Sequence, residues 1–297
     1  MKIVTYQWGG QRHVGRLSAD GKDVTPFQFE GKWRERASSR GALALIEMQA
    51  EGQKLPAMGA PSLPFSAITL EAPIPRPRRN IFCVGKNYTE HAKEFAGSGF
   101  DSSATKPGDD IPEVPYVFSK VPECVIAPGD TIRIPSKIST AIDYEGELAV
   151  VIGKGGYGIS KTRALDHVWG YTILNDVTSR DWQQRHKQWH MGKSFDTFGP
   201  MGPCLVSADE CDGTNTRLRT WVNDELRQDA RTTDLIFDIP TLIECISSGI
   251  TLYPGDIIAT GTPVGVGIGF KPPKYLQPGD TVRIEIDGIG TLENPVR

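Results

Sequence analysis

The sequence predicts an α+β protein that is mainly β. Glycine and proline are frequent, with 32 and 22 among 297 residues, which is typical of many turns between short strands. Three Pro-Gly-Asp turns each precede a run with strand character, at residues 131–134, 257–260 and 281–286. Helical patterns are few, so we expect a fold dominated by a mixed or antiparallel sheet.

A small unit is expected at the start of the chain. Residues 2–6 and 12–17 have strand character and are joined across Gly9-Gly10, whereas residues 42–50 favour a short helix. Residues 72–79 then contain three prolines, which enforce an extended connector. We therefore predict a small N-terminal α+β domain, residues 1–72, followed by a larger domain, residues 73–297.

The larger domain begins with a buried strand at 81–85. Residues 96–115 are polar and rich in Gly, Ser, Asp and Pro, which predicts either a functional lid, at about 90–115, or a disordered surface insertion. One helix is expected at 160–169, with Ser160 as its N-cap and Gly170 at its end. A second is expected at 239–248, with Pro240 in its first turn.

The composition is that of a soluble globular protein, with 38% hydrophobic and 23% charged residues. Lysine and arginine total 33 against 36 acidic residues without a basic tract, so nucleic acid is not an expected partner. No run approaches the roughly 20 apolar residues of a membrane span, and the first residues lack the apolar core of a signal peptide. Five scattered cysteines without a C-x-x-C pair indicate reduced thiols in a cytoplasmic protein.

The most informative motif is the acidic segment DYEGE at 143–147, which opens an apolar run. Alternate side chains of a strand share a face, so Asp143, Glu145 and Glu147 are expected to point the same way. A bound divalent cation would relieve their repulsion, and the alternative is a solvated strand face. Asp176 ends another apolar strand and either caps a helix or supplies a third oxygen ligand. An all-oxygen set suits Mg²⁺, Mn²⁺ or Ca²⁺ rather than zinc.

Two pairs of residues are candidates for substrate contact and proton transfer. Arg180 and Gln183 share a face if their segment is helical, where they could fix a substrate carboxylate or simply face solvent. His91 and Glu94, at i and i+3, could form a dyad in which the carboxylate orients a general base, or be unrelated surface neighbours. Their place between a buried strand and a candidate lid favours the dyad.

Two loops of small residues could approach an anion. Lys193 lies in such a loop, 192–200, and could face an anionic centre. Residues 261–267 are glycine-rich but lack the Gly-Lys-Ser/Thr ending of a P-loop, so close backbone approach to a small anion is favoured over nucleotide binding. His186 and His190 have helical spacing but lack the glutamate of a zinc-binding H-E-x-x-H motif.

Taken together, these segments resemble the fumarylacetoacetate hydrolase family. The matching pieces cover about residues 73–297 and occur in one order: 85–88 with His91 and Glu94, 143–148, 175–176 with Arg180 and Gln183, 193–202, 260–267, and a bacterial-type segment at 271–294. Lys86 departs from the pattern, since the family often has arginine there. A lysine keeps the charge but weakens any bidentate contact with a carboxylate.

The resemblance implies a mixed β-sandwich or roll domain that holds Mg²⁺ or Mn²⁺, and a homodimer. It implies that the metal ligands are Glu145, Glu147 and Asp176, with Asp143 in a supporting role. It further implies a water-activating dyad of His91 and Glu94, with Lys193 steadying an oxyanion. The substrate contacts that it implies are Arg180, Gln183, Thr262, Lys86 and Tyr88.

The expected reaction is cleavage of an acylpyruvate-type 1,3-diketo acid, such as fumarylpyruvate or maleylpyruvate, to pyruvate and a carboxylic acid. A 2-oxo acid can chelate the cation, which stabilises the enolate that forms as the carbon–carbon bond breaks. The same site would serve decarboxylation of oxaloacetate-like acids, or isomerisation or hydration of unsaturated 2-oxo diacids in aromatic catabolism. A reading from a different class is a non-catalytic keto-acid-binding protein. The sequence does not separate these activities.

Overall fold

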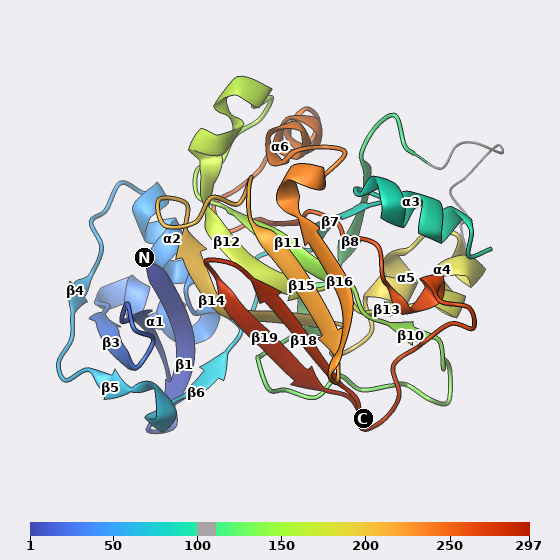
Figure 1. Cartoon of the computed structure of the whole chain (residues 1–297). Coiled ribbons are helices and arrows are strands. Elements are labelled where there is room, and N and C mark those ends of the chain that lie inside the picture. The colour runs from blue at the N-terminus through green and yellow to red at the C-terminus, as the bar shows by residue number, and fades with distance from the viewer. Residues whose placement is uncertain (100–110) are drawn as a thin grey trace.

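One long mixed sheet runs through the computed structural model, which describes residues 1–99 and 111–297 (Figure 1). Thirteen of the strands in these residues belong to it, and the main path is β4-β3-β2-β1-β14-β12-β11-β17-β7-β8. β5, β6 and β9 pair beside this path with β3, β1 and β14. The bounds are β1 Lys2–Trp8, β2 Gln11–Leu17, β3 Asp23–Gln28, β4 Ala57–Met58, β5 Leu63–Pro64, β6 Thr69–Glu71, β7 Ile81–Gly85, β8 Tyr116–Lys120, β9 Val125–Ile126, β11 Gly146–Ile152, β12 Val168–Asn175, β14 Gly199–Ser207 and β17 Ile257–Ala259.

Two smaller sheets and a set of short helices complete the described fold. The small sheets are β10-β13 (Ile142–Asp143 and Thr178–Ser179) and β16-β15-β18-β19 (Glu225–Arg231, Arg217–Val222, Thr281–Ile286 and Gly290–Pro295). The α-helices are α1 Gly31–Arg40, α2 Leu43–Ala50, α3 Thr89–Ala96, α4 Arg180–His186, α5 His190–Lys193 and α6 Ile239–Ser247. The 3₁₀ helices are η1 Phe65–Ala67, η2 Pro122–Cys124, η3 Lys161–His167, η4 Thr232–Asp234 and η5 Gly267–Gly269.

The strand β11 of the long sheet is buried on both faces, by a different partner on each. Leu148, Val150 and Ile152 of β11 belong to a core that also contains apolar residues of the four-stranded sheet and of α6. Ala149 and Val151 belong to a second core with residues of α1 and α2. Successive side chains of a strand point to opposite faces, and here each face packs against a core. This is why β11 is apolar on both faces. The prediction of an α+β, mainly β fold is confirmed.

Several predicted elements are confirmed within a residue or two. They are the hairpin of β1 and β2, the helix α2, the buried strand β7, the helix α6, and the strands β17 and β18 that follow Pro-Gly-Asp turns. β1 also pairs with β14, so the sheet continues across the predicted domain boundary at residue 72. The division into two domains stays a prediction. None of the described helices combines the length and apolarity that a membrane crossing requires.

The expected helix at 160–169 is wrong as an α-helix. The chain forms the 3₁₀ helix η3 at Lys161–His167 and then enters β12 at Val168. Gly170 does not end a helix but lies inside β12, where a Cβ atom would come within 2.0 Å of the Val206 carbonyl oxygen of β14. The glycine therefore serves close approach of two strands, a need that local sequence does not reveal.

Two further expectations need correction. Residues 131–134 do not form a ladder strand, because only Ile132 makes an isolated bridge, with Val296. The acidic segment is also not one continuous strand, since β10 ends at Asp143 and β11 begins at Gly146. At the break, the Glu145 backbone N–H donates to the Asn175 side chain instead of to a ladder partner. The Asp143 side chain therefore need not point to the same side as Glu145 and Glu147, as it would in one continuous strand.

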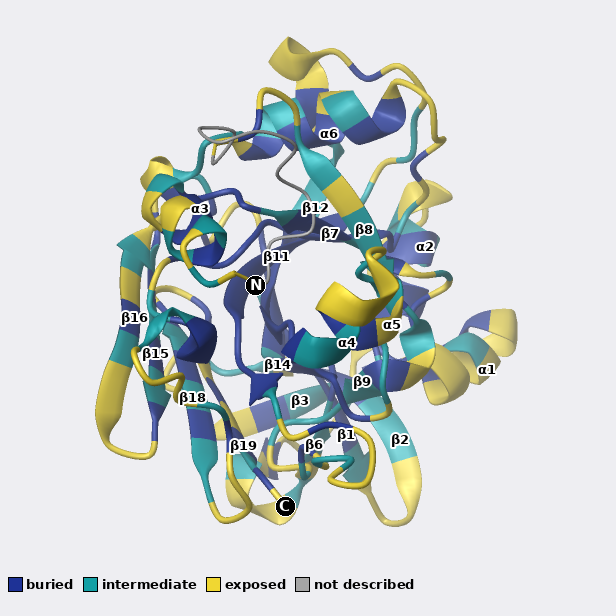
Figure 2. Ribbon diagram, turned by 90° about the vertical axis from the view of Figure 1, so that its right-hand side faces the viewer, coloured by how far each residue is buried: buried dark blue, intermediate teal, exposed yellow. Residues whose placement is uncertain are grey.

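Three short helices gather at one end of the molecule. α3, α4 and α5 lie on the right in Figure 1, the end that faces the viewer in Figure 2. α5 packs against β8, and α3 packs against η5. The start of β11 and the end of β12 lie side by side, with Glu147 inside β11, Glu145 just before it and Asp176 just after β12.

Candidate metal centre and adjoining cavity

Three buried carboxylates meet where β11 begins and β12 ends. Glu145, Glu147 and Asp176 each offer an oxygen, and these oxygens lie within 4.8 Å of one another. Pairing of Gly146 with Asn175 sets the two strands in register, and the Asp176 N–H donates to the Glu145 carbonyl oxygen at 2.8 Å. The structure thus brings together the predicted ligand set. Asp143 lies outside this set and pairs with Arg180 instead, and its supporting role stays a prediction.

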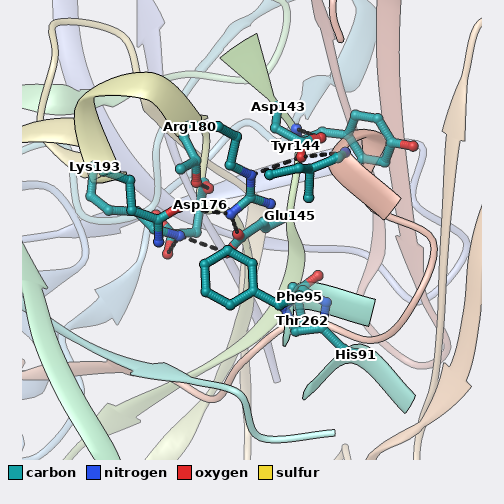
Figure 3. A network of polar contacts seen from close by, with 12 residues as sticks. His91, Phe95, Asp143, Tyr144, Glu145, Asp176, Arg180, Lys193 and Thr262 are labelled. Atoms are coloured by element: carbon teal, nitrogen blue, oxygen red, sulfur yellow. Dashed lines mark hydrogen bonds and ion pairs between the residues drawn. The ribbon is translucent and has the colours of Figure 1, made fainter. Parts of the chain in front are cut away.

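Three cationic side chains accompany these acids, and Figure 3 labels two of them, Arg180 and Lys193. Lys193 Nζ lies 2.7 Å from Glu145 and 2.8 Å from Asp176. Arg180 Nη1 lies 2.7 Å from Glu145, and Lys120 Nζ lies 2.7 Å from Asp176. All three cations are at most 2% exposed, so the charges are compensated inside the protein rather than by water.

Glu147 has different partners from the other two acids. Its carboxylate accepts the Gly261 N–H at 2.8 Å, and no cationic side chain of the described residues forms an ion pair with it. Burial, together with the charges of Asp176 and Glu145, raises the pKa of Glu147 well above its ordinary value. Burial also acts to raise the pKa of Glu145, but Lys193 and Arg180 hold that pKa below its ordinary value.

The donor set fits a hard divalent cation. It consists of carboxylate oxygens alone, and the described residues of the cluster include no thiol or imidazole ligand. Oxygen donors of this kind suit Mg²⁺ and Mn²⁺. The carboxylates could therefore bind a divalent metal, with Lys193 sharing two of them.

The predicted dyad is formed within α3. His91 Nδ1 lies 3.1 Å from Glu94 Oε2, and the imidazole is buried. The other side of the Glu94 carboxylate accepts the Gly265 N–H at 3.0 Å. The glutamate can therefore fix the ring orientation and leave the far imidazole nitrogen for a reacting group.

Arg180 and Gln183 lie on one face of α4, as the helical spacing predicted. Arg180 Nε donates to Asp143 at 2.8 Å and Nη1 donates to Gln183 Oε1 at 3.2 Å. Nη2 is buried and has no hydrogen-bond partner among the described residues. A buried guanidinium N–H of this kind, beside a cavity, is suited to donate a hydrogen bond to an anionic ligand.

The remaining predicted contacts fall in different places. Thr262 lines the cavity, but its hydroxyl already donates to the Gly146 carbonyl oxygen and accepts from Gln228. Lys86 lines the same cavity and adopts a φ of 54°. A left-handed lysine is rare, and such strain is often stored where a side chain must be aimed. Tyr88 lines a separate hollow instead, so its predicted role as a substrate contact has no support from this geometry.

A small cavity adjoins the acidic cluster and collects most of these groups. It is narrow and partly open to solvent, and it is lined by Val84, Gly85, Lys86, His91, Phe95, Phe118, Glu145, Arg180, Gln183, Trp189, Lys193 and Thr262. Trp189 stands edge-on to Phe95 and Phe118. The cavity thus has an aromatic wall and a polar wall. The polar wall contains His91 and the cationic side chains of Lys86, Arg180 and Lys193. It suits a small anion.

Sequence reasoning missed Lys120 and the aromatic wall. Lys120 ends β8, and its ammonium also donates to the Val177 and Lys193 carbonyl oxygens. A lysine that closes an apolar strand was the available signal, since it must find compensation if the strand is buried. The predicted lid falls partly on residues 100–110, which lie outside the described residues.

Comparison with known proteins agrees with this architecture. The model of the fumarylacetoacetate hydrolase C-terminal domain matches residues 80–297. An oxaloacetate tautomerase of Bacillus subtilis (strain 168) is 45% identical over an alignment of 312 residues that covers 100% of both chains. A mitochondrial oxaloacetate tautomerase of Homo sapiens is 43% identical over 239 residues, which cover 80% of this chain and 72% of the relative.

Solved structures show the same fold. A fumarylacetoacetate hydrolase from Exiguobacterium antarcticum is 36% identical, with a TM-score of 0.82 and coverage of 100% of this chain and 99% of the other. A 5-carboxymethyl-2-hydroxymuconate delta-isomerase from Mycobacterium smegmatis is 33% identical, with a TM-score of 0.77 and the same coverage. The protein therefore belongs to the fumarylacetoacetate hydrolase family of enzymes.

Proposed function

We propose that this protein is a Mg²⁺- or Mn²⁺-dependent tautomerase that interconverts the keto and enol forms of a small 2-oxo diacid of the oxaloacetate class. The observation that carries the proposal is the small cavity beside the acidic cluster. It is lined by His91, by the cationic side chains of Lys86, Arg180 and Lys193, and by Glu145 of the cluster. The small size of the cavity favours a compact dianion over a long substrate. The names of the most similar relatives agree with this substrate class.

The reaction requires removal of a proton from the carbon beside the keto group and its return to oxygen. A divalent cation at Glu145, Glu147 and Asp176 would supply Lewis-acid stabilisation of the charge that develops on the keto oxygen. His91 would take and return the proton, and its contact with Glu94 at 3.1 Å, which can orient the imidazole, supports this role.

Other side chains of the cavity would bind and orient the substrate. Arg180 Nη2, which has no partner in the described part of the chain, can donate to a carboxylate, and the Asp143 ion pair holds the guanidinium in place. Lys86 and Gln183 line the same wall and can hold the second carboxylate. Lys193 keeps a positive charge at the centre, since Asp176 and Glu145 raise its pKa despite burial, which acts to lower it.

The test is proton exchange at C3 of oxaloacetate, followed by NMR in D₂O with Mg²⁺ and measured above the rate with metal alone. We expect exchange without release of CO₂, and a loss of about 10²- to 10⁴-fold in His91→Ala with Mn²⁺ affinity retained. His186→Ala, on the exposed end of α4, is the matched control and should stay at the wild-type rate. Wild-type exchange in His91→Ala would leave the dyad idle and favour a non-catalytic keto-acid-binding protein.

A second candidate is hydrolysis of an acylpyruvate to pyruvate and a carboxylic acid. It is favoured by the same dyad, because an imidazole held by a carboxylate beside a metal centre can also activate water. Pyruvate release from an acylpyruvate panel, with CO₂ measured in parallel, distinguishes hydrolysis from decarboxylation. Release of pyruvate without C3 exchange on oxaloacetate would replace the tautomerase proposal by the hydrolase.

A further inference from the structure

The carboxylate of Glu94 is held from two sides. Its Oε2 atom contacts His91 Nδ1 at 3.1 Å, and the Gly265 N–H donates to Oε1 at 3.0 Å and to Oε2 at 3.3 Å. The Glu94 side chain is 12% exposed, so the carboxylate is largely shielded from water. The backbone of the glycine-rich segment 261–269 thus fixes the residue that orients the imidazole.

Gly269 forms the floor under this carboxylate. A Cβ atom built on Gly269 would lie 2.0 Å from Glu94 Oε1, 2.3 Å from Cδ and 2.5 Å from Cγ. These are the three nearest atoms, and all of them belong to the Glu94 side chain. Contacts this short cannot persist, so a methyl group at Gly269 must displace the Glu94 carboxylate from its present position.

Gly269 is the suitable position in this segment at which to test the contact. The backbone at Gly269 does not have a positive φ, so alanine fits the local conformation. A Cβ atom at Gly265 would instead meet the Arg227 carbonyl oxygen at 1.8 Å, and one at Gly267 would meet the Lys274 carbonyl oxygen at 2.3 Å. Alanine at those two glycines would disturb the backbone, whereas at Gly269 a flexible side chain gives way.

We infer that Gly269 is a positioning residue of the reaction. The absence of a side chain lets Glu94 reach the Gly265 N–H, and that bond keeps the carboxylate on His91 Nδ1. Gly269 would act through Glu94 alone, because it is not among the residues that line the cavity or the acidic cluster. This inference rests on the proposed function, since it requires the His91–Glu94 dyad to carry the proton.

The experiment compares G269A, E94Q and the double variant G269A/E94Q in the C3 exchange assay with Mn²⁺. We expect G269A to lower kcat by about 10- to 100-fold, which is part of the contribution of a positioned base, with KM and Mn²⁺ affinity within twofold of wild type. Because both substitutions remove the same contact, the double variant should be no more than twofold slower than E94Q. If G269A instead acted only by disturbing the structure, its loss in kcat would add to the loss in E94Q.

A shorter acid and a matched glycine provide the controls. E94D draws the carboxylate back from the space that a methyl group would fill, so G269A should cost less in the E94D background than in the wild type. G249A follows α6, where a Cβ atom has no neighbour within 4 Å, and should leave kcat and the melting temperature unchanged.

The outcomes separate the inference from the proposed function. If the wild type shows no C3 exchange above the rate with metal alone, the proposed function is wrong. If the wild type is active and E94Q keeps its kcat, Glu94 does not carry the reaction, so the inference about Gly269 is wrong while the proposed function stands. If E94Q is slow while G269A keeps the wild-type kcat, only the role of Gly269 is overturned. Additive losses in G269A/E94Q, or weaker Mn²⁺ binding in G269A, would also overturn it, since Gly269 would then act through another part of the protein.

Discussion

Glu147 is the carboxylate of the acidic cluster whose charge the described residues compensate least. Glu145 and Asp176 contact lysine or arginine, whereas Glu147 accepts a backbone N–H from Gly261. Its pKa is raised by burial and by the two neighbouring acids, so the folded, metal-free protein holds a proton that the unfolded chain releases. Through Glu147, the free energy of unfolding should depend on pH and on whether a metal ion is bound.

The first prediction is that the metal-free protein loses stability as pH rises. Below the unfolded pKa of Glu147 both states are protonated and the contribution is fully present. Between the unfolded and the raised folded pKa, the folded state binds one more proton, so the free energy of unfolding falls by up to about 1.4 kcal/mol per pH unit. Urea denaturation in the presence of a chelator measures it.

Glu147→Gln is the variant that isolates this effect. An amide does not titrate, so the variant should lose that part of the slope and be more stable than the wild type at high pH in chelator. Parallel pH profiles for the two proteins would assign the slope to other groups and contradict the prediction.

At the scale of single residues, sequence reasoning recovered what a local motif carries. Glu145, Glu147 and Asp176 stand beside apolar strands, and that contrast alone indicates a functional use of charge. Lys120 could not be recognised in the same way, because the acid that compensates it is 56 residues away along the chain. A buried ion pair between distant residues leaves no spacing pattern in the sequence.

At the scale of elements, local periodicity decided which predictions were confirmed. α6 was predictable because Leu242, Ile243 and Ile246 recur on one buried face and Pro240 suits the first turn. α1 was missed because only Trp33 and Ala37 of its ten residues are buried, which leaves no apolar stripe. The segment 160–169 was wrongly predicted as an α-helix. Its first part forms the 3₁₀ helix η3, and its last two residues belong to the strand β12.

The second prediction concerns the cap of α6. Asp238 accepts the Thr241 N–H at 2.9 Å, so Asp238→Ala should lower the free energy of unfolding by about 1 kcal/mol. Lys161, which forms an exposed ion pair with Asp238, provides the control, and Lys161→Ala should have a smaller effect. Equal losses in the two variants by chemical denaturation would assign the effect to the ion pair.

At the scale of the whole molecule, the sheet joins parts of the chain that sequence analysis treated separately. β1 pairs with β14, and β17 pairs with both β11 and β7, so the N-terminal strands and the strands that carry the cluster form one sheet. The fold class was predictable from turn and strand composition. The strand order was not, because it depends on pairings between residues far apart in sequence.

The third prediction is that a divalent cation stabilises the whole fold. A ligand at 100 times its Kd that binds only the folded state raises the free energy of unfolding by about 2.7 kcal/mol. Mg²⁺ or Mn²⁺ should therefore raise the melting temperature of the wild type but not of Glu147→Gln, which loses a ligand without leaving a lysine unpaired. Calorimetry with and without chelator measures both, and equal shifts in the two proteins would place the cation elsewhere.

The contact between Glu94 and Gly265 spans 171 residues, and this distance has a consequence for folding kinetics. We expect contacts between residues this far apart in sequence to form late, because closing a long loop costs entropy before any contact compensates for it. We therefore expect the dyad and the glycine-rich segment to come together after most of the sheet has formed. A cation that binds beside them would slow unfolding of the finished protein without acting as a nucleus for its folding.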